Sequence, residues 1–172
     1  MRVVPTLFSG ITFRSRTEAR WAVVFEALGW RYDYEPEGFI LPSGRYYPDF
    51  YLPNIKAFFE VKGQTPTDLE LRKAEELCVA TENIVVVSHG PPNPQRNEWD
   101  RDLSTFCPER DLGDKPFADC HQGGFVGGRL IDHPKCSIDL GNLVYLPGLT
   151  ELGWEDAFRR AVNHRFDLFP QQ

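Results

Sequence analysis

Apolar residues recur at helix-compatible intervals soon after the start of the chain, at Ala19, Ala22, Val23, Phe25, Ala27 and Leu28. Ser15 precedes them and is a residue type that caps helix N-termini, with Glu18 at the third helical position. Gly29 follows them, and glycine commonly ends a helix. The pattern therefore predicts a helix between Ser15 and Gly29.

The stretch from Trp30 to Leu41 is rich in aromatic residues, which favour strands. We expect extended backbone around Tyr32–Tyr34 and Phe39–Leu41, before the turn signal Pro42-Ser43-Gly44. The pattern predicts a strand followed by an irregular connection.

Two further strand candidates, Arg45–Leu52 and Lys56–Lys62, flank the turn-like residues Pro53-Asn54-Ile55. This arrangement predicts a β-hairpin. Asp49 and Glu60 are equidistant from the centre of the turn, so we expect them to be cross-strand neighbours.

The chain then returns to helical spacing. The stretch Thr67–Thr81 suits an amphipathic helix, because apolar residues occur among charged ones, at Leu69, Leu71, Ala74, Leu77 and Cys78. Ile84–Val87 is a short apolar run that predicts a buried strand. The first ninety residues therefore predict a helix, three strands, a helix and a strand.

The composition of the sequence changes at His89. From there to about Gly141 it contains many Gly, Pro, Asp and Cys residues and shows little hydrophobic periodicity. We expect a long irregular insertion, of the kind that has a function, binds a metal or is disordered. Leu143–Leu146 is a candidate late strand. A C-terminal helix is predicted over Trp154–Phe166, with three residues directed inward: Phe158, Ala161 and Val162.

Length and composition indicate one domain, residues 1–172, because 41% of the 172 residues are hydrophobic, enough for a single core. The first ten residues lack the features of a secretory signal, and no run of about 18 apolar residues is present. We expect a cytoplasmic protein without a membrane partner. Four cysteines are too few for a disulfide scaffold, and Cys78 is expected to be a buried thiol.

The formal net charge of -6 is unusual for a protein that binds nucleic acid. Its distribution is uneven: residues 1–64 carry eight Lys and Arg against seven Asp and Glu, so the acidic excess lies in residues 65–172. A carboxylate-rich metal site would also add acidic residues that bound cations neutralise. Charge therefore does not decide whether the chain binds nucleic acid.

Asp49, Glu60 and Lys62 are the chemically informative residues of the predicted hairpin. Opposed residues in an antiparallel pair have Cβ atoms roughly 4.5–5.5 Å apart, so two carboxylates there could share a cation that removes their repulsion. Because side chains alternate along a strand, Lys62 lies on the face of Glu60. Phosphodiester hydrolysis needs an activated water and a cation near the scissile phosphate. Oxygen ligands favour Mg²⁺ or Mn²⁺ over Zn²⁺.

Pro48-Asp49, ten intervening residues and Glu60-Val61-Lys62 together resemble the motif of the PD-(D/E)xK nuclease superfamily. The segment FRSRTEARWA is similar to the family's first helix, whose acidic residue, here Glu18, commonly completes the metal site. The predicted order of elements is also similar to the family's core. The resemblance covers residues 13–88, about half of the chain, and is greatest to small stand-alone members from phages, plasmids and bacterial genomes.

The resemblance implies an α/β, restriction-endonuclease-like core with a central mixed β-sheet flanked by helices. To this core the chain adds the irregular Cys/His-containing insertion, residues 89–141, and a C-terminal strand and helix, residues 142–172. The implied function is Mg²⁺- or Mn²⁺-dependent hydrolysis of nucleic acid, DNA in particular. Asp49 and Glu60 would bind the metal, Glu18 would assist directly or through water, and Lys62 would position the attacking water.

Other polar residues are candidates for supporting roles. Gln64 follows Lys62 by two and is a candidate accessory residue, while Arg14, Arg16 and Arg20 surround the first helix start, where phosphates could bind. A second basic patch lies on the C-terminal helix, at Arg159, Arg160, His164 and Arg165. Each has a simpler alternative, since charged residues commonly form solvated faces. Glu18 could act only as the capping partner of Ser15.

Residue types typical of a tetrahedral zinc site occur in the irregular insertion, at Cys107, Cys120, His121, His133 and Cys136. Only His133 and Cys136 have tight ligand spacing, so unrelated thiols and histidines are the alternative to a structural Zn²⁺. At the level of function, the alternative is a catalytically silent nucleic-acid-binding or assembly module on the same fold. The pattern does not decide the oligomeric state, and a homodimer is among the alternatives.

Overall fold

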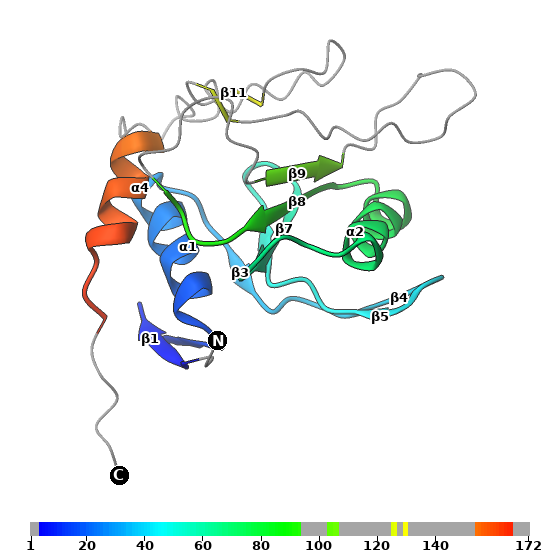
Figure 1. Ribbon diagram of the computed structural model, residues 1–172, viewed down its shortest axis with the longest axis horizontal. Coiled ribbons are helices and arrows are strands. Elements are labelled where there is room, and N and C mark those ends of the chain that lie inside the picture. The colour runs from blue at the N-terminus through cyan, green and yellow to red at the C-terminus, as the bar shows by residue number, and fades with distance from the viewer. Residues whose placement is uncertain (1–3, 94–102, 107–124, 127–128, 131–153, 167–172) are drawn as a thin grey trace.

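The computed structural model describes residues 4–93, 103–106, 125–126, 129–130 and 154–166 (Figure 1). Its centre is a five-stranded sheet in the order β3-β6-β7-β8-β9. The strands are β3 (Asp33–Tyr34), β6 (Phe50–Leu52), β7 (Ala57–Lys62), β8 (Ile84–His89) and β9 (Leu103–Phe106). The pairing of β7 with β8 is parallel and the other pairings are antiparallel. The sheet is therefore mixed, as the sequence predicts.

Helices cover both faces of this sheet. The helices α1 (Arg16–Ala27) and α4 (Trp154–Asn163) lie side by side on one face, and α2 (Asp68–Thr81) covers the other (Figure 1). Within the described residues, three two-stranded sheets lie outside it: β1 (Thr6–Phe8) with β2 (Ile11–Phe13), β4 (Phe39–Leu41) with β5 (Gly44–Tyr46), and β10 (Phe125–Val126) with β11 (Arg129–Leu130). The α/β class with helices flanking a mixed sheet is confirmed.

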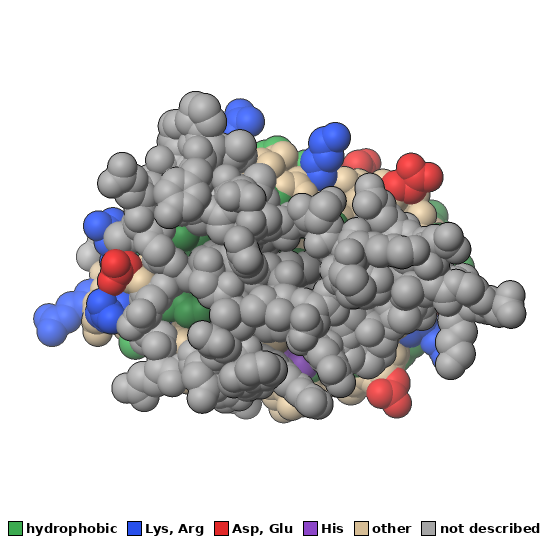
Figure 2. All heavy atoms as spheres, turned by 90° about the horizontal axis from the view of Figure 1, so that it is seen from above, with side chains coloured by type: hydrophobic (Ala, Val, Ile, Leu, Met, Phe, Trp, Pro, Cys, Tyr) green, Lys and Arg blue, Asp and Glu red, His purple; other side chains and the backbone are tan. Residues whose placement is uncertain are grey.

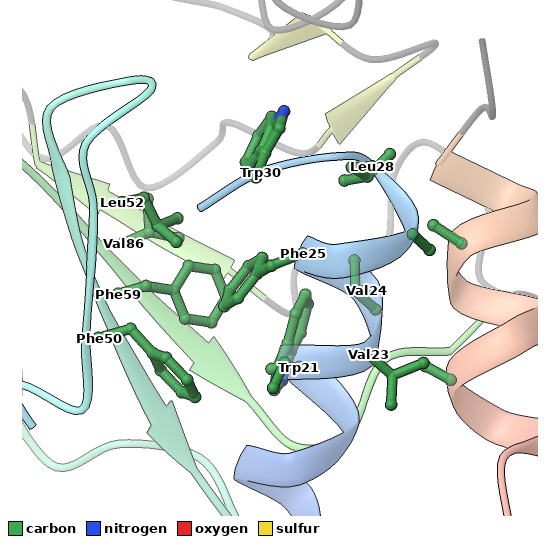
Figure 3. Close-up of a cluster of buried hydrophobic side chains, with 14 of the residues drawn as sticks. Trp21, Val23, Val24, Phe25, Leu28, Trp30, Phe50, Leu52, Phe59 and Val86 are labelled. Carbon is green, nitrogen blue, oxygen red and sulfur yellow. The ribbon is translucent and has the colours of Figure 1, made fainter. Parts of the chain in front are cut away.

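Aromatic side chains fill the space between α1 and the sheet. Figure 3 shows Trp21 and Phe25 directed from α1 toward the strands. The Trp21 ring centroid is 4.7 Å from that of Phe59, and the Phe25 centroid is 5.3 Å from that of Phe50. Val23 points instead toward α4 (Figure 3). Such pairs stabilise the core beyond the burial of their area.

The side chains of β7 alternate between the two layers. Ala57 and Phe59 belong to the core under α1, whereas Phe58 packs with the residues under α2. Cys78 of α2 lies in that second core, fully buried, as predicted. The alternation sends Glu60 and Lys62 to the α2 side of the strand.

The predicted strand Arg45–Leu52 is wrong as a single strand. Its first part, β5, pairs with β4, and its last part, β6, pairs with β7. Pro48 lies between the two parts, has no backbone N–H to donate and fixes its own φ, so one ladder cannot continue through it. The break separates a hairpin from the central sheet.

The expectation of an irregular segment from His89 onward is corrected by β9. This strand pairs with β8 and buries Leu103 and Phe106. A four-residue strand leaves little periodicity for a sequence pattern to register, which explains why it was not predicted.

The C-terminal helix ends at Asn163, earlier than predicted, and its buried face includes Ala157 and Ala161. Val162 was expected to point inward and is 39% exposed. Residues four apart share a helix face, and the residue after Ala161 is rotated about 100° away from that face.

The candidate strand Leu143–Leu146 and the five candidate zinc ligands, Cys107, Cys120, His121, His133 and Cys136, lie outside the described residues. No helix in the described ranges is long and apolar enough to cross a membrane. In the described part of the face seen from above, Lys and Arg side chains are interspersed with Asp and Glu (Figure 2). The charges on that part of the face are therefore mixed, without a gathering of one sign.

Candidate active site

The register of β6 and β7 brings Asp49 and Glu60 together. Phe50 pairs with Phe59, so the residues one step further along the two strands are Asp49 and Glu60. Both side chains belong to buried residues, 3% and 6% exposed. The Asp49 backbone N–H donates to Glu60 Oε2 at 3.3 Å, and the Val61 N–H donates to Asp49 Oδ2 at 2.7 Å. The predicted cross-strand relation of the two carboxylates is present.

Arg14, in the segment between β2 and α1, supplies the positive charge nearest to Asp49. One of its terminal amino groups donates to Asp49 Oδ1, and its Nε lies 2.9 Å from Glu35 Oε1. The same Nε is 3.9 Å from Glu18 Oε2. Arg14, expected as a phosphate contact, is thus engaged with carboxylates from three parts of the chain.

Asp49 remains incompletely compensated despite this ion pair. Burial and the neighbouring Glu60 carboxylate raise the pKa of Asp49 to about 8, although the Val61 N–H and Arg14 act in the opposite direction. Two buried acids this close favour a shared proton or a cation over two free negative charges. The Asp49–Glu60 pair is therefore where positive charge is still needed.

Lys62 neutralises the Glu60 side. Its Nζ lies 2.7 Å from Glu60 Oε1 and 3.1 Å from Glu70 Oε1 in the first turn of α2. Burial opposes the charged form, but the Glu60 and Glu70 carboxylates outweigh it and raise the pKa of Lys62. Glu70 is also the partner of Thr67 in a capping box, so the helix start fixes its position.

Glu18 reaches the site from α1 and is only 7% exposed. The Tyr34 hydroxyl donates to its Oε2 at 2.6 Å, and the Ser15 hydroxyl donates to its Oε1 at 2.7 Å. Ser15 also caps the helix by accepting from the Glu18 N–H at 3.1 Å. Glu18 can therefore be the capping partner of Ser15 and also belong to the candidate active site.

Tyr46 borders the carboxylates from the α2 side of the sheet. It is 7% exposed, and burial, with Glu60 and Asp49 adding to the effect, raises the pKa of its hydroxyl. The group stays neutral over the physiological range.

Three residues of the site were not predicted. Glu70 had a readable signal, the Thr-x-x-Glu spacing of a capping box, which placed it at a helix start but did not connect it with Lys62. For Tyr34 and Tyr46, sequence spacing offers no signal, because both contacts cross between elements.

The remaining candidates lie at the margins. Gln64 is exposed beyond the end of β7, Arg16 is exposed, and Arg20 is half-buried on α1. On α4, Arg159 pairs with Asp156 at 2.8 Å. Just beyond the end of α4, the His164 ring packs against Phe8 at a centroid distance of 5.0 Å. The C-terminal basic residues belong to a separate surface, so they do not join the carboxylates.

A divalent cation fits the chemistry of Asp49 and Glu60, with one qualification in the geometry. Among the residues that the structure describes, no group of three or more Asp, Glu, His or Cys is arranged to hold a metal ion. Glu18 is turned to Tyr34 and Ser15 instead. Mg²⁺, however, is commonly bound through one or two carboxylates together with waters and substrate phosphates. A pair of buried oxygen ligands with excess negative charge meets that requirement.

Comparison with known proteins leaves the family open. No family model and no curated protein matches the sequence. Among solved structures, the chain is similar to a "putative nuclease belonging to DUF820" from Anabaena variabilis ATCC 29413, with 9% sequence identity, 94% of each chain covered and a TM-score of 0.42. A TM-score at this level does not establish a shared fold.

Proposed function

We propose that this chain is a divalent-metal-dependent nuclease that hydrolyses phosphodiester bonds, with DNA as its substrate. The observation that carries the proposal is the buried Asp49–Glu60 pair with Lys62 bound to one of its carboxylates. Buried like charges cost stability, and catalytic sites are where such arrangements concentrate. The PD-(D/E)xK-like pattern of these residues adds to this reasoning.

Asp49 and Glu60 would hold Mg²⁺ or Mn²⁺, which when bound offsets the negative charge of the reacting phosphate and lowers the pKa of water. Lys62, held between Glu60 and Glu70, would orient the attacking water or stabilise an oxygen that becomes negative. Glu18 would accept a hydrogen bond from water at the edge of the site. Tyr34 and Ser15 would keep its carboxylate in place.

The arginines near α1 would contact the substrate backbone. Arg14 would leave Asp49 for a phosphate when a metal takes its place, and Arg16 and Arg20 would approach phosphates at the helix start. Gln64 would be an accessory residue beside Lys62. A structural Zn²⁺ on Cys107, Cys120, His121, His133 and Cys136 is a separate proposal, tested by metal analysis of protein purified without chelator.

The test compares Asp49→Ala and Glu60→Ala with the wild type on single-stranded, duplex, flapped and branched DNA and on RNA, with Mg²⁺ or Mn²⁺. Each variant should lower cleavage by at least about a hundredfold, because it removes a metal ligand. Asp33→Ala removes an exposed carboxylate from the same sheet and serves as the control. Cleavage at the wild-type rate by either variant would refute the assignment of the active site. If the wild-type protein binds nucleic acid but cleaves none of these substrates, the catalytically silent binding module is favoured.

A further inference from the structure

The hairpin of β4 and β5 has one buried and one exposed face. Phe39 pairs with Tyr46 and Ile40 pairs with Arg45, so side chains alternate between the faces. The face toward α2 holds Phe39, Leu41 and Tyr46. The opposite face, here called the outer hairpin face, consists of Ile40, Arg45 and Tyr47, with Ile40 87% and Tyr47 60% exposed. The outer hairpin face therefore presents two large, solvent-exposed side chains beside a positive charge.

Tyr47 is held in place by the glycine opposite it. One step beyond the Phe39–Tyr46 pair, the register sets Gly38 across from Tyr47. A Cβ built on Gly38 would lie 2.3 Å from Tyr47 Cε1 and 2.6 Å from Cδ1, so the ring occupies the place of that missing side chain. One side of the ring is thus covered by the Gly38 backbone, while the residue as a whole stays open to solvent.

The hairpin itself is tied to α2. The Ser43 backbone N–H and hydroxyl donate to the Glu76 carboxylate at 2.9 and 2.6 Å, and Lys73 Nζ donates to the Arg45 carbonyl at 3.3 Å. Figure 1 shows the two strands extending from the central sheet alongside α2. The outer hairpin face is therefore presented on a fixed support, which lowers the entropy that binding would cost.

Along the chain, Tyr47 lies next to the candidate active site. Only Pro48 separates Tyr47 from Asp49, a span of about 6–7 Å in extended chain. Arg45 is exposed and forms no salt bridge with any described residue, so its charge is available to an anion. A flat aromatic ring beside a free guanidinium is the combination that recognises a base together with the phosphate of its strand.

We propose that the outer hairpin face binds an unpaired stretch of the nucleic-acid substrate, with a base stacked on Tyr47 and the strand's phosphate near Arg45. The inference rests on the proposed nuclease function and adds its substrate class, a strand with single-stranded bases next to the cleaved bond. A base inside a fully paired duplex has no free face for the ring. Tyr47 also covers Gly38, a structural role that cross-strand aromatic residues play in hairpins, and the variants must separate the two roles.

The experiment measures fluorescence anisotropy of a labelled oligothymidylate of about a dozen nucleotides, and of its blunt duplex, with full-length protein in EDTA. Tyr47→Leu keeps an apolar group over Gly38 but removes the flat ring, and should weaken single-strand binding between about fivefold and a hundredfold. Tyr47→Phe should bind within about twofold of the wild type. Val79→Ala, which truncates another exposed apolar residue on α2, is the control and should bind like the wild type.

Arg45→Gln gives a second measure that does not depend on Tyr47. Losing one phosphate contact should lower the slope of log affinity against log salt by about one unit. Thermal unfolding confirms that each variant folds. Wild-type affinity of Tyr47→Leu, or an equal loss for Tyr47→Phe, overturns the inference, as does tighter binding of the blunt duplex. Cleavage by the wild type is measured separately. If the variants weaken binding as expected but the wild type does not cleave, only the nuclease proposal is overturned. If the wild type cleaves but Tyr47→Leu binds with unchanged affinity, only this inference is overturned.

Discussion

Arg14 and Lys62 each bind one of the two adjacent buried carboxylates, yet their surroundings differ. Arg14 belongs to the segment before α1, and 55% of its side chain is exposed. Lys62 lies on β7, has 21% of its side chain exposed, and is held by Glu70 as well as Glu60. Lys62 is therefore held between the sheet and α2. Arg14 is more exposed, and its side chain is free to move away from Asp49.

In the proposed nuclease, the difference would separate two tasks of the site. Burial and Glu60 raise the pKa of Asp49 even with Arg14 beside it, so the carboxylate pair still lacks positive charge. Lys62 has its own pKa raised by its two carboxylates and remains a fixed cation. We infer that the Asp49 half is adapted to exchange one cation for another, and the Glu60 half to keep its ammonium group through the reaction.

Replacing the fixed cation tests this division most strongly. Lys62→Ala should retain divalent-metal binding, because Asp49 and Glu60 remain, yet lower single-turnover cleavage by on the order of 10²–10³. Calorimetric titration with Mn²⁺ and single-turnover cleavage measure the two effects separately. Lys56→Ala, which removes an exposed lysine from the turn before the same strand, is the control.

Two other outcomes would contradict the prediction for Lys62. Joint loss of metal binding and cleavage would mean that Lys62 maintains the arrangement of Glu60 and Asp49. Near-normal cleavage would make it a surface residue and remove the main support for the nuclease proposal.

The sequence alone predicts some features of the candidate site and not others. The Asp49–Glu60 relation follows from the symmetry of a turn, and the place of Glu18 follows from a capped helix start. Both depend on local rules of spacing and alternation. They were therefore predictable from the order of residues.

Contacts between distant elements were not predictable. Tyr34 reaches Glu18, and Glu70 reaches Lys62, only after the sheet and helices pack. Pro48 carried a readable signal for breaking the strand, but its effect, a hairpin leaving the sheet beside Asp49, depends on pairing between β4 and β5. Local pattern identifies the residues, and tertiary packing decides their partners.

The incomplete neutralisation of Asp49 predicts a pH-dependent stability in metal-free protein. With a pKa of about 8 in the folded state against 3.8 ordinarily, Asp49 loses its proton first in the unfolded chain as pH rises. The folded wild type therefore loses stability between about pH 4 and pH 8. Asp49→Asn stays neutral and avoids this loss, so its free energy of unfolding should exceed that of wild type by at least about 1 kcal/mol at pH 8.

Urea unfolding in EDTA at pH 4, 6 and 8 measures the effect. The advantage of Asp49→Asn should shrink toward zero at the lowest pH, where the wild-type carboxyl is protonated in the folded state and close to its ordinary pKa in the unfolded chain. Glu82→Gln changes an exposed carboxylate and should show no such trend. A variant less stable than wild type at pH 8 would show that Arg14 compensates Asp49 fully, and the contrast between the two halves would be lost.

Arg14 itself tests whether the Asp49 half exchanges cations, with the smallest expected effect. Arg14→Ala removes the charge that competes with a metal for Asp49 Oδ1, so Mn²⁺ should bind more tightly. Because Arg14 is largely exposed, its attraction is screened, and the gain should be no more than about fivefold. Calorimetry measures it, with Arg16→Ala, an exposed arginine two residues along at the start of α1, as the matched control. Cleavage should fall in the same variant if Arg14 moves to a substrate phosphate once the metal is bound, because that contact would be lost. Weaker Mn²⁺ binding in Arg14→Ala would contradict the exchange, since Arg14 would then be holding Asp49 in position for the metal and both cations would belong to the permanent structure of the site.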